Sequence, residues 1–138
     1  PQQQRLLRRQ RWRLFGRPQM SHLGEHLLAE LYQCPAAALA DAAGVEQALY
    51  AAARAAGAHV LAGHFHHFGT GQGVTGVLLL AESHISIHTW PEHGYAAVDL
   101  FLCGSAAHAA ALAVLQQALQ VGRIEQRCVA RGQLPVPA

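Results

Sequence analysis

The chain has 138 residues, of which 51% are hydrophobic and 13% are charged, so its composition predicts one folded domain and excludes a disordered chain. No apolar run approaches the ~20 residues of a membrane-spanning helix, so we expect no membrane partner. The three cysteines are an odd and sparse set, which predicts reduced thiols in a cytoplasmic protein rather than a disulfide framework.

Residues 1–19 differ from the rest of the chain in charge. Six of the ten arginines lie before Met20, the only methionine. From Met20 onward four arginines face eight acids, a formal balance of −4, so the overall charge of +2 belongs to the leading stretch. We therefore expect residues 1–19 to be a disordered basic extension, and we predict no nucleic-acid partner for the domain.

The spacing of apolar residues predicts alternating strands and helices. Helices are expected over about 45–56 and from Ser105 to Leu119, because apolar residues recur there at helical spacing. The predicted order is strand, helix, strand, strand, then strand, strand, helix, strand, which indicates an α+β two-layer sandwich. Strands are expected at residues 24–32, 59–68, 74–80, 81–90, 95–102 and 123–130.

The stretch from Ala81 to Glu92 is the most polar of the predicted strands. From Ser83 onward polar and apolar residues alternate, with Ile85 and Ile87 on one face and histidines and serine on the other. Strict alternation would place Ser83 on the isoleucine face, so we expect it at a turn or kink. A core strand does not require so many side-chain proton donors and acceptors, so the stretch is a candidate functional site.

Residues 81–99 read A-E-S-H-I-S-I-H-T-W-P-E-H-G-Y-A-A-V-D, which resembles the processing site of prokaryotic S-adenosylmethionine decarboxylases. The resemblance extends over residues 20–132, with further matching segments at 24–34, 65–68, 73–76 and 101–104. It implies a mainly antiparallel sheet backed by two helices, paired into a homodimer. We therefore divide the chain into an extension (1–19), a decarboxylase domain (20–132) and a tail (133–138).

The resemblance implies that the chain cleaves itself between Glu82 and Ser83. The Ser83 hydroxyl would attack the Glu82 carbonyl, and β-elimination and hydrolysis would then leave a pyruvoyl group in place of Ser83. His88 is the expected proton-transfer group, because an imidazole side chain can both accept and donate a proton near neutral pH. Thr75 stands where the family usually has a serine that assists processing.

The pyruvoyl group is the expected cofactor and would form a Schiff base with the substrate amine. The sequence contains no lysine, which excludes a pyridoxal-phosphate enzyme with its lysine Schiff base. Cys103 matches the family's proton donor, whereas Cys34 and Cys128 are expected in the core.

The family's substrate, S-adenosylmethionine, would yield its decarboxylated form and CO2 for spermidine synthesis. Phe68 matches the aromatic residue that stacks on adenine, and we expect His66 and Glu30 near the same pocket. Three features depart from the family pattern. They are Thr75, a glycine-rich loop that is one residue longer before Gly73, and a histidine at position 93. Relatives that decarboxylate arginine or ornithine share the cleavage motif, so these substrates are the alternative.

Two non-enzymatic functions compete with this interpretation. The ten histidines suggest a metal-binding module, with His64-x-His66 and His84-x3-His88 as ligand pairs. Strand residues four apart lie ~13 Å apart, too far to share one ion, so no metal is predicted. The second alternative is an inactive relative that activates a partner, which the complete set of Glu82, Ser83, His88 and Cys103 argues against.

Overall fold

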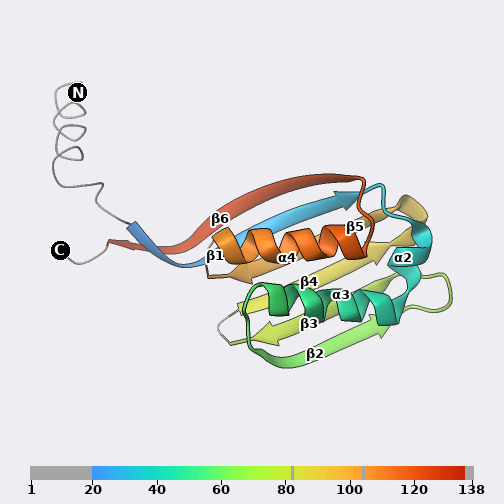
Figure 1. Cartoon of the computed structure of the whole chain (residues 1–138), viewed down its shortest axis with the longest axis horizontal. Helices are drawn as coiled ribbons and strands as arrows, with labels where there is room; N and C mark the ends of the chain where they lie inside the picture. Colours follow the sequence, from blue (N-terminus) through green and yellow to red (C-terminus); the bar gives the residue numbers. More distant parts are fainter. Residues whose placement is uncertain (1–19, 82, 104, 136–138) are drawn as a thin grey trace, which may run out of the picture.

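The computed structural model describes residues 20–81, 83–103 and 105–135. These residues form a six-stranded sheet, three α-helices and one turn of 3-10 helix, η1, at Pro91–His93 (Figure 1). The helices are α2 (Ala36–Ala40), α3 (Ala42–Ala55) and α4 (Ser105–Ala118). The strands are β1 (Met20–Tyr32), β2 (Val60–His67), β3 (Val74–Leu80), β4 (Ser83–Trp90), β5 (Tyr95–Leu102) and β6 (Arg123–Pro135).

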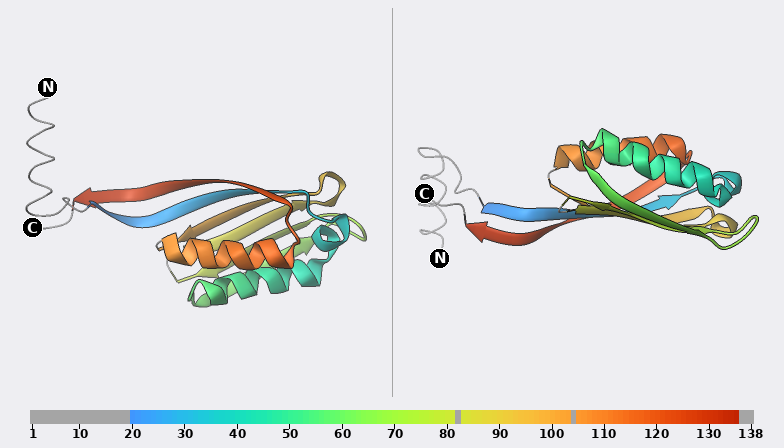
Figure 2. Two further views of the ribbon diagram at one scale, coloured as in Figure 1. Left: turned by 45° about the horizontal axis from the view of Figure 1, so that its top comes forward. Right: turned by 90° about the horizontal axis from the view of Figure 1, so that it is seen from below.

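The strands lie in the order β2-β3-β4-β5-β1-β6, and each neighbouring pair among the described residues is antiparallel. The two long helices, α3 and α4, lie side by side over one face of the sheet (Figure 2). This arrangement confirms the predicted α+β sandwich with two backing helices, to which the structure adds the short α2. None of the described helices is both long and apolar enough to span a membrane.

The hydrophobic core fills the space between the sheet and the two long helices. Helix α3 is capped by Asp41, whose side chain accepts a hydrogen bond from the Gly44 amide at 3.0 Å, as expected for an N-cap. It buries apolar residues at helical spacing, including Val45 and Leu49, and α4 likewise buries Leu115 and Leu119. The predicted apolar stripes of both helices are therefore confirmed.

Alternate residues of the strands point away from the helices and form what we call the open face. In β4 the buried side chains are Ile85, Ile87 and Thr89, as the alternation predicts. The remaining β4 side chains from His84 onward belong to the open face, which no described helix covers. Ser83 is the first residue of β4 and lies opposite Leu80 of β3.

The two neighbouring strands β1 and β6 extend further than the sequence predicts. Strand β1 begins at Met20 rather than Gly24, and β6 ends at Pro135 rather than Ala130. The two extensions pair with each other, Met20 opposite Pro135, and so satisfy each other's backbone hydrogen bonds (Figure 1). The predicted tail is therefore strand up to Pro135, while residues 1–19 and 136–138 lie outside the described residues.

A buried threonine connects the short helix α2 to the centre of the sheet. Thr89 Oγ1 accepts a hydrogen bond from the Val74 amide and donates one to the Leu39 carbonyl, both at 2.8 Å. Thr89→Val leaves both backbone groups buried without partners, so we expect the free energy of unfolding to fall by about 3 kcal/mol. Urea denaturation at fixed protein concentration measures the change, with Thr70→Val in the exposed 69–73 loop as control. Equal stability of the two variants would contradict this role for Thr89.

Candidate active site

Ser83 and Cys103 lie at the same end of neighbouring strands. His84 pairs with Phe101, so Ser83 begins β4 beside the point where β5 ends at Leu102 and the chain continues to Cys103. Cys103 is exposed, and its Sγ lies 3.9 Å from the Leu23 carbonyl oxygen. The sheet thus brings together the predicted cleavage residue and the predicted proton donor, whereas Glu82 lies outside the described residues.

A layer of rings covers the open face beside this end of the sheet. The imidazole of His84 stacks on Phe101 with ring centroids 5.7 Å apart, and His26 contacts both rings edge-on. Next to these rings, Asp99 accepts a hydrogen bond from the Ser86 hydroxyl at 3.3 Å and lies 3.6 Å from His26 Nε2. The layer fixes the open-face side chains next to the cleavage residue by packing and polar contacts.

His88 and Thr75 form a pair at the opposite end of the open face. They lie directly opposite each other on β4 and β3, and His88 Nδ1 is 3.2 Å from Thr75 Oγ1. A hydrogen bond at one ring nitrogen orients the imidazole and leaves Nε2 for proton transfer. The structure therefore brings the two predicted processing residues, Thr75 and His88, into direct contact.

An open cavity of about 360 Å³ lies beside the pair, a volume at the lower end of the range for small-molecule sites. Its walls include Phe68, Gln72, Thr75, His88, Trp90 and Glu92. Phe68 is 61% exposed, so its ring is available for stacking. His66 packs edge-on against Phe68 with centroids 4.5 Å apart and supports that ring rather than lining the cavity.

The glycine-rich loop reaches the cavity through a close backbone contact. A Cβ at Gly73 would lie 2.1 Å from the Thr89 carbonyl oxygen, so only glycine fits there. The contact holds the loop against the end of β4, next to Trp90. The loop that departs in length from the family pattern therefore forms part of the cavity wall.

Ser83 and His88 do not meet within one chain. They are five residues apart on β4, which corresponds to roughly 16 Å along an extended strand. A hydrogen bond requires donor and acceptor within about 3 Å, so His88 of the same chain cannot reach Ser83 directly. Each chain therefore presents two half-sites, one with Ser83 and Cys103 and one with Thr75, His88 and Phe68.

Comparisons with known proteins identify the family of the chain. The profile of the S-adenosylmethionine decarboxylase family matches residues 25–132, which is most of the chain. The chain belongs to this family. The matched residues extend from β1 to β6 and therefore include both half-sites.

Two relatives match more than four fifths of the chain. A protein of Methanococcus maripaludis named S-adenosylmethionine decarboxylase proenzyme is 44% identical over 120 residues, which are 85% of this chain and 96% of that protein. A protein of the same name from Acidithiobacillus ferrooxidans is 41% identical over 83% of this chain and 86% of its own. The crystal structure of the adenosylmethionine decarboxylase from Aquifex aeolicus has a TM-score of 0.78 at 35% identity, covering 86% of this chain and 98% of that one.

Glu30 lies away from the cavity of this family member. Its carboxylate accepts a hydrogen bond from the Tyr95 hydroxyl on the open face, and burial together with this carboxylate raises the pKa of Tyr95. Tyr95 stacks between Trp90 and Tyr32, with centroids 5.3 Å apart on each side. Glu30 therefore belongs to an aromatic cluster and does not line the pocket where we predicted it.

Trp90 and Glu92 line the cavity but are not among the predicted site residues. Trp90 was predictable, because it lies two residues after His88 on the same strand and so on the same face. Glu92 follows Pro91 in η1, where strand alternation no longer applies, so no regular pattern placed it in the site.

The two remaining cysteines have different surroundings. Cys34 is buried, as predicted, and burial raises the pKa of its thiol. Cys128 is exposed on the edge strand β6, so its predicted core position is wrong. An edge strand has a neighbour on one side only, and most side chains of β6 are exposed.

Proposed function

We propose that this protein cleaves itself between Glu82 and Ser83 and then decarboxylates S-adenosylmethionine to CO2 and decarboxylated S-adenosylmethionine, the aminopropyl donor for spermidine synthesis. The observation that supports this most directly is the geometry of the two half-sites. The predicted cleavage residue and proton donor occupy one end of the sheet, and the hydrogen-bonded Thr75–His88 pair lies beside a cavity at the other.

Processing begins at the peptide bond before β4. The Ser83 oxygen attacks the Glu82 carbonyl carbon, and transfer of the acyl group from nitrogen to oxygen replaces the amide with an ester. Removal of the Ser83 α-proton then expels the Glu82 carboxylate and leaves dehydroalanine, and water releases ammonia to give the ketone. His88 accepts or donates the protons in these steps, since it is the oriented imidazole of the site.

The residues present fit a pyruvoyl group, because it forms from Ser83 itself and the thiol of Cys103 lies at the same end of the sheet. When formed, the group supplies an electrophilic ketone that withdraws electrons from an amine substrate. Cys103 donates the proton that replaces the carboxylate on the substrate carbon. Phe68 binds the adenine by stacking, and its ring face also attracts the sulfonium cation.

The protein acts as a homodimer in this proposal, because one chain cannot bring its two half-sites together. We expect the open faces of the two chains to pack against each other about a two-fold axis. The Ser83 end of each chain then lies against the His88 end of its partner. One dimer then holds two complete sites, each with Ser83 and Cys103 from one chain and Thr75, His88 and Phe68 from the other.

The open face has the composition of a protein interface. Phe68 and Trp90, which are 61% and 39% exposed, lie on it together with the exposed Leu79 and Val129. Large aromatic side chains are enriched at the centres of interfaces. Pairing these faces would remove the apolar surface from water while enclosing the cavity beside His88.

The choice of substrate rests on the cavity and on the relatives. Those described above are named for S-adenosylmethionine, and Phe68 provides a stacking surface that an aliphatic amino acid does not use. Release of labelled CO2 from S-adenosylmethionine, arginine and ornithine by the cleaved protein distinguishes the alternatives. We expect release from S-adenosylmethionine alone, and release only from arginine or ornithine would overturn the assignment.

Thr75 serves as a positioning residue for His88. Thr75→Val removes the hydroxyl 3.2 Å from Nδ1 while keeping the branched shape, so we expect self-cleavage to slow by about 10²-fold. Thr75→Ser retains the hydroxyl and is expected to cleave at nearly the original rate. Cleavage is followed by gel electrophoresis over time, and an unchanged rate in the valine variant would contradict the role of this contact.

The cytoplasmic location remains a prediction from the cysteine content. An odd number of three cysteines is typical of reduced thiols rather than of a disulfide framework. Fractionation of cells that express the tagged protein tests it.

A further inference from the structure

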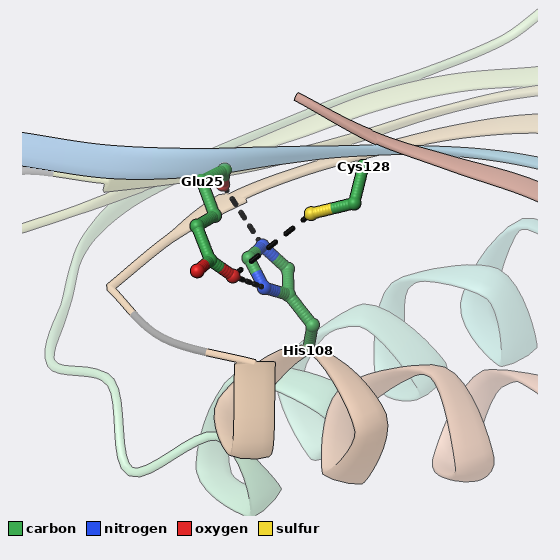
Figure 3. A group of neighbouring side chains, drawn as sticks. All are labelled: Glu25, His108 and Cys128. Carbon is green, nitrogen blue, oxygen red and sulfur yellow. Dashed lines mark hydrogen bonds and ion pairs between the residues drawn. The ribbon is translucent and has the colours of Figure 1, made fainter. Parts of the chain in front are cut away.

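A second group of reactive side chains lies on the helix side of the sheet, where α4 meets β1 and β6 (Figure 3). Glu25 belongs to β1, Cys128 to β6 and His108 to the first turns of α4. One ligand atom from each residue lies within 4.8 Å of the other two. The proposed reaction uses none of these residues, so the cluster requires a separate explanation.

The hydrogen bonds of His108 determine which ring nitrogen holds the proton. Nε2 lies 2.9 Å from the Glu25 carbonyl oxygen and 3.0 Å from the Leu100 carbonyl oxygen. Carbonyl oxygens only accept hydrogen bonds, so Nε2 is the protonated nitrogen and donates to both. In the neutral ring the lone pair is therefore on Nδ1, which points into the cluster.

Nδ1 of His108 has no hydrogen-bond partner among the described residues, although the residue is only 4% exposed. The nearest charged atom is Oε2 of Glu25, 3.4 Å away. A buried lone pair that faces a carboxylate oxygen is unfavourable, because both atoms are electron-rich and the Nδ1 atom has no hydrogen-bond donor to satisfy it. A cation between the two atoms would satisfy both.

The remaining geometry fits a small tetrahedral ion. Cys128 Sγ lies 3.9 Å from the same Oε2 atom of Glu25, and the other oxygen, Oε1, accepts a hydrogen bond from His22 at 2.8 Å. Ligands at the usual zinc distances of about 2.0 to 2.3 Å are separated from each other by roughly 3.3 to 3.8 Å in a tetrahedron. The two separations from Glu25 Oε2, 3.4 and 3.9 Å, need little change to match, and all three ligand atoms lie within 4.8 Å of one another.

We propose that Glu25, His108 and Cys128 bind one zinc ion, with water as the fourth ligand. A nitrogen, a sulfur and a carboxylate oxygen together favour zinc over calcium or magnesium, which prefer oxygen alone. The second nitrogen of a zinc-bound histidine typically donates to a backbone carbonyl, as Nε2 does here. The ion would fasten the start of α4 to β1 and β6, five residues after Cys103.

The thiol of Cys128 must lose its proton to bind the ion. The Cys128 thiol lies in hydrogen-bond range of the Glu25 carboxylate, and desolvation together with this carboxylate raises the pKa of the thiol. Zinc binds the thiolate, so binding releases this proton and the affinity decreases as the pH falls. A metal-free ion pair between protonated His108 and Glu25 is the competing explanation.

Titration of the full-length, chelator-treated protein with Co2+ tests the proposal, because cobalt bound to a thiolate gives a charge-transfer absorption band in the near ultraviolet. We expect one equivalent per chain, displaced by Zn2+. Cys128→Ser should abolish the band, and His108→Gln, which keeps a donor for the two carbonyls, should weaken binding at least about tenfold. Cys103→Ser is the matched control, since it removes the other exposed thiol and should retain the band.

Thermal unfolding provides a second measurement that is independent of decarboxylation. Zinc should raise the unfolding temperature of the unmodified protein and of Cys103→Ser, but not that of Cys128→Ser. The proposal is overturned if no cobalt binds, if the band persists in Cys128→Ser, or if it disappears in Cys103→Ser. Failure of the site would leave the decarboxylase assignment unaffected, because the cluster takes no part in that chemistry.

Discussion

Ser83→Ala is expected to abolish both self-cleavage and decarboxylation. Alanine has no hydroxyl to attack the Glu82 carbonyl, so the chain stays intact and no ketone forms. Loss of the group on which the reaction depends should reduce CO2 release from S-adenosylmethionine by more than about 10⁴-fold. Gel electrophoresis and the CO2 assay measure the two losses on the same sample.

Ser86→Ala is the matched control for this substitution. Ser86 lies on the same strand and its hydroxyl donates to Asp99, but it is three residues from the cleavage point. We expect this variant to be cleaved. A Ser83→Ala protein that still splits at this position, or that decarboxylates at the original rate, would refute the role of Ser83.

Two inactive variants are expected to restore activity when they form a mixed dimer. Ser83→Ala damages one half-site and His88→Ala damages the other, so a dimer with one chain of each kind keeps one complete site of two. Co-expression with two affinity tags and sequential purification isolates this dimer. We expect about half of the original CO2 release per dimer, because a two-fold symmetric dimer has two equivalent sites.

The identity of the cleaved chain gives this experiment its second readout. The His88→Ala chain keeps its own Ser83 and receives His88 from its partner, so it is the chain that should be cleaved. As control, Ser83→Ala combined with Cys103→Ala should restore no decarboxylation, since both changes affect the same half-site. An inactive first mixture, or an active second one, would contradict the shared site.

Local sequence patterns predicted the elements that form the site. The alternation in β4 correctly placed Ile85 and Ile87 against the helices and His84 and His88 on the open face. Strand bounds at β3 and β5 matched the prediction, because each is a regular run of alternately buried residues. The family motif in turn named Ser83, His88 and Cys103 as the candidate catalytic residues.

The long-range relations were not predictable in the same way. The distance between Ser83 and His88 can be calculated from their positions on one strand. How the two residues could form one site, however, depends on a second copy of the chain. The pairing of Met20 with Pro135 joins residues at the two ends of the domain. The cluster of Glu25, His108 and Cys128 unites three elements spread over more than a hundred residues, and Cys128 was wrongly expected in the core.

Intact mass spectrometry of the purified, denatured protein tests the central claim most directly. We predict two masses that correspond to a chain ending at Glu82 and a chain beginning at the former Ser83. The second chain should react with a carbonyl reagent and lack a free amino terminus, because the serine has become a pyruvoyl group. A single uncleaved mass that persists after long incubation would contradict the account, since no ketone would then be available for decarboxylation.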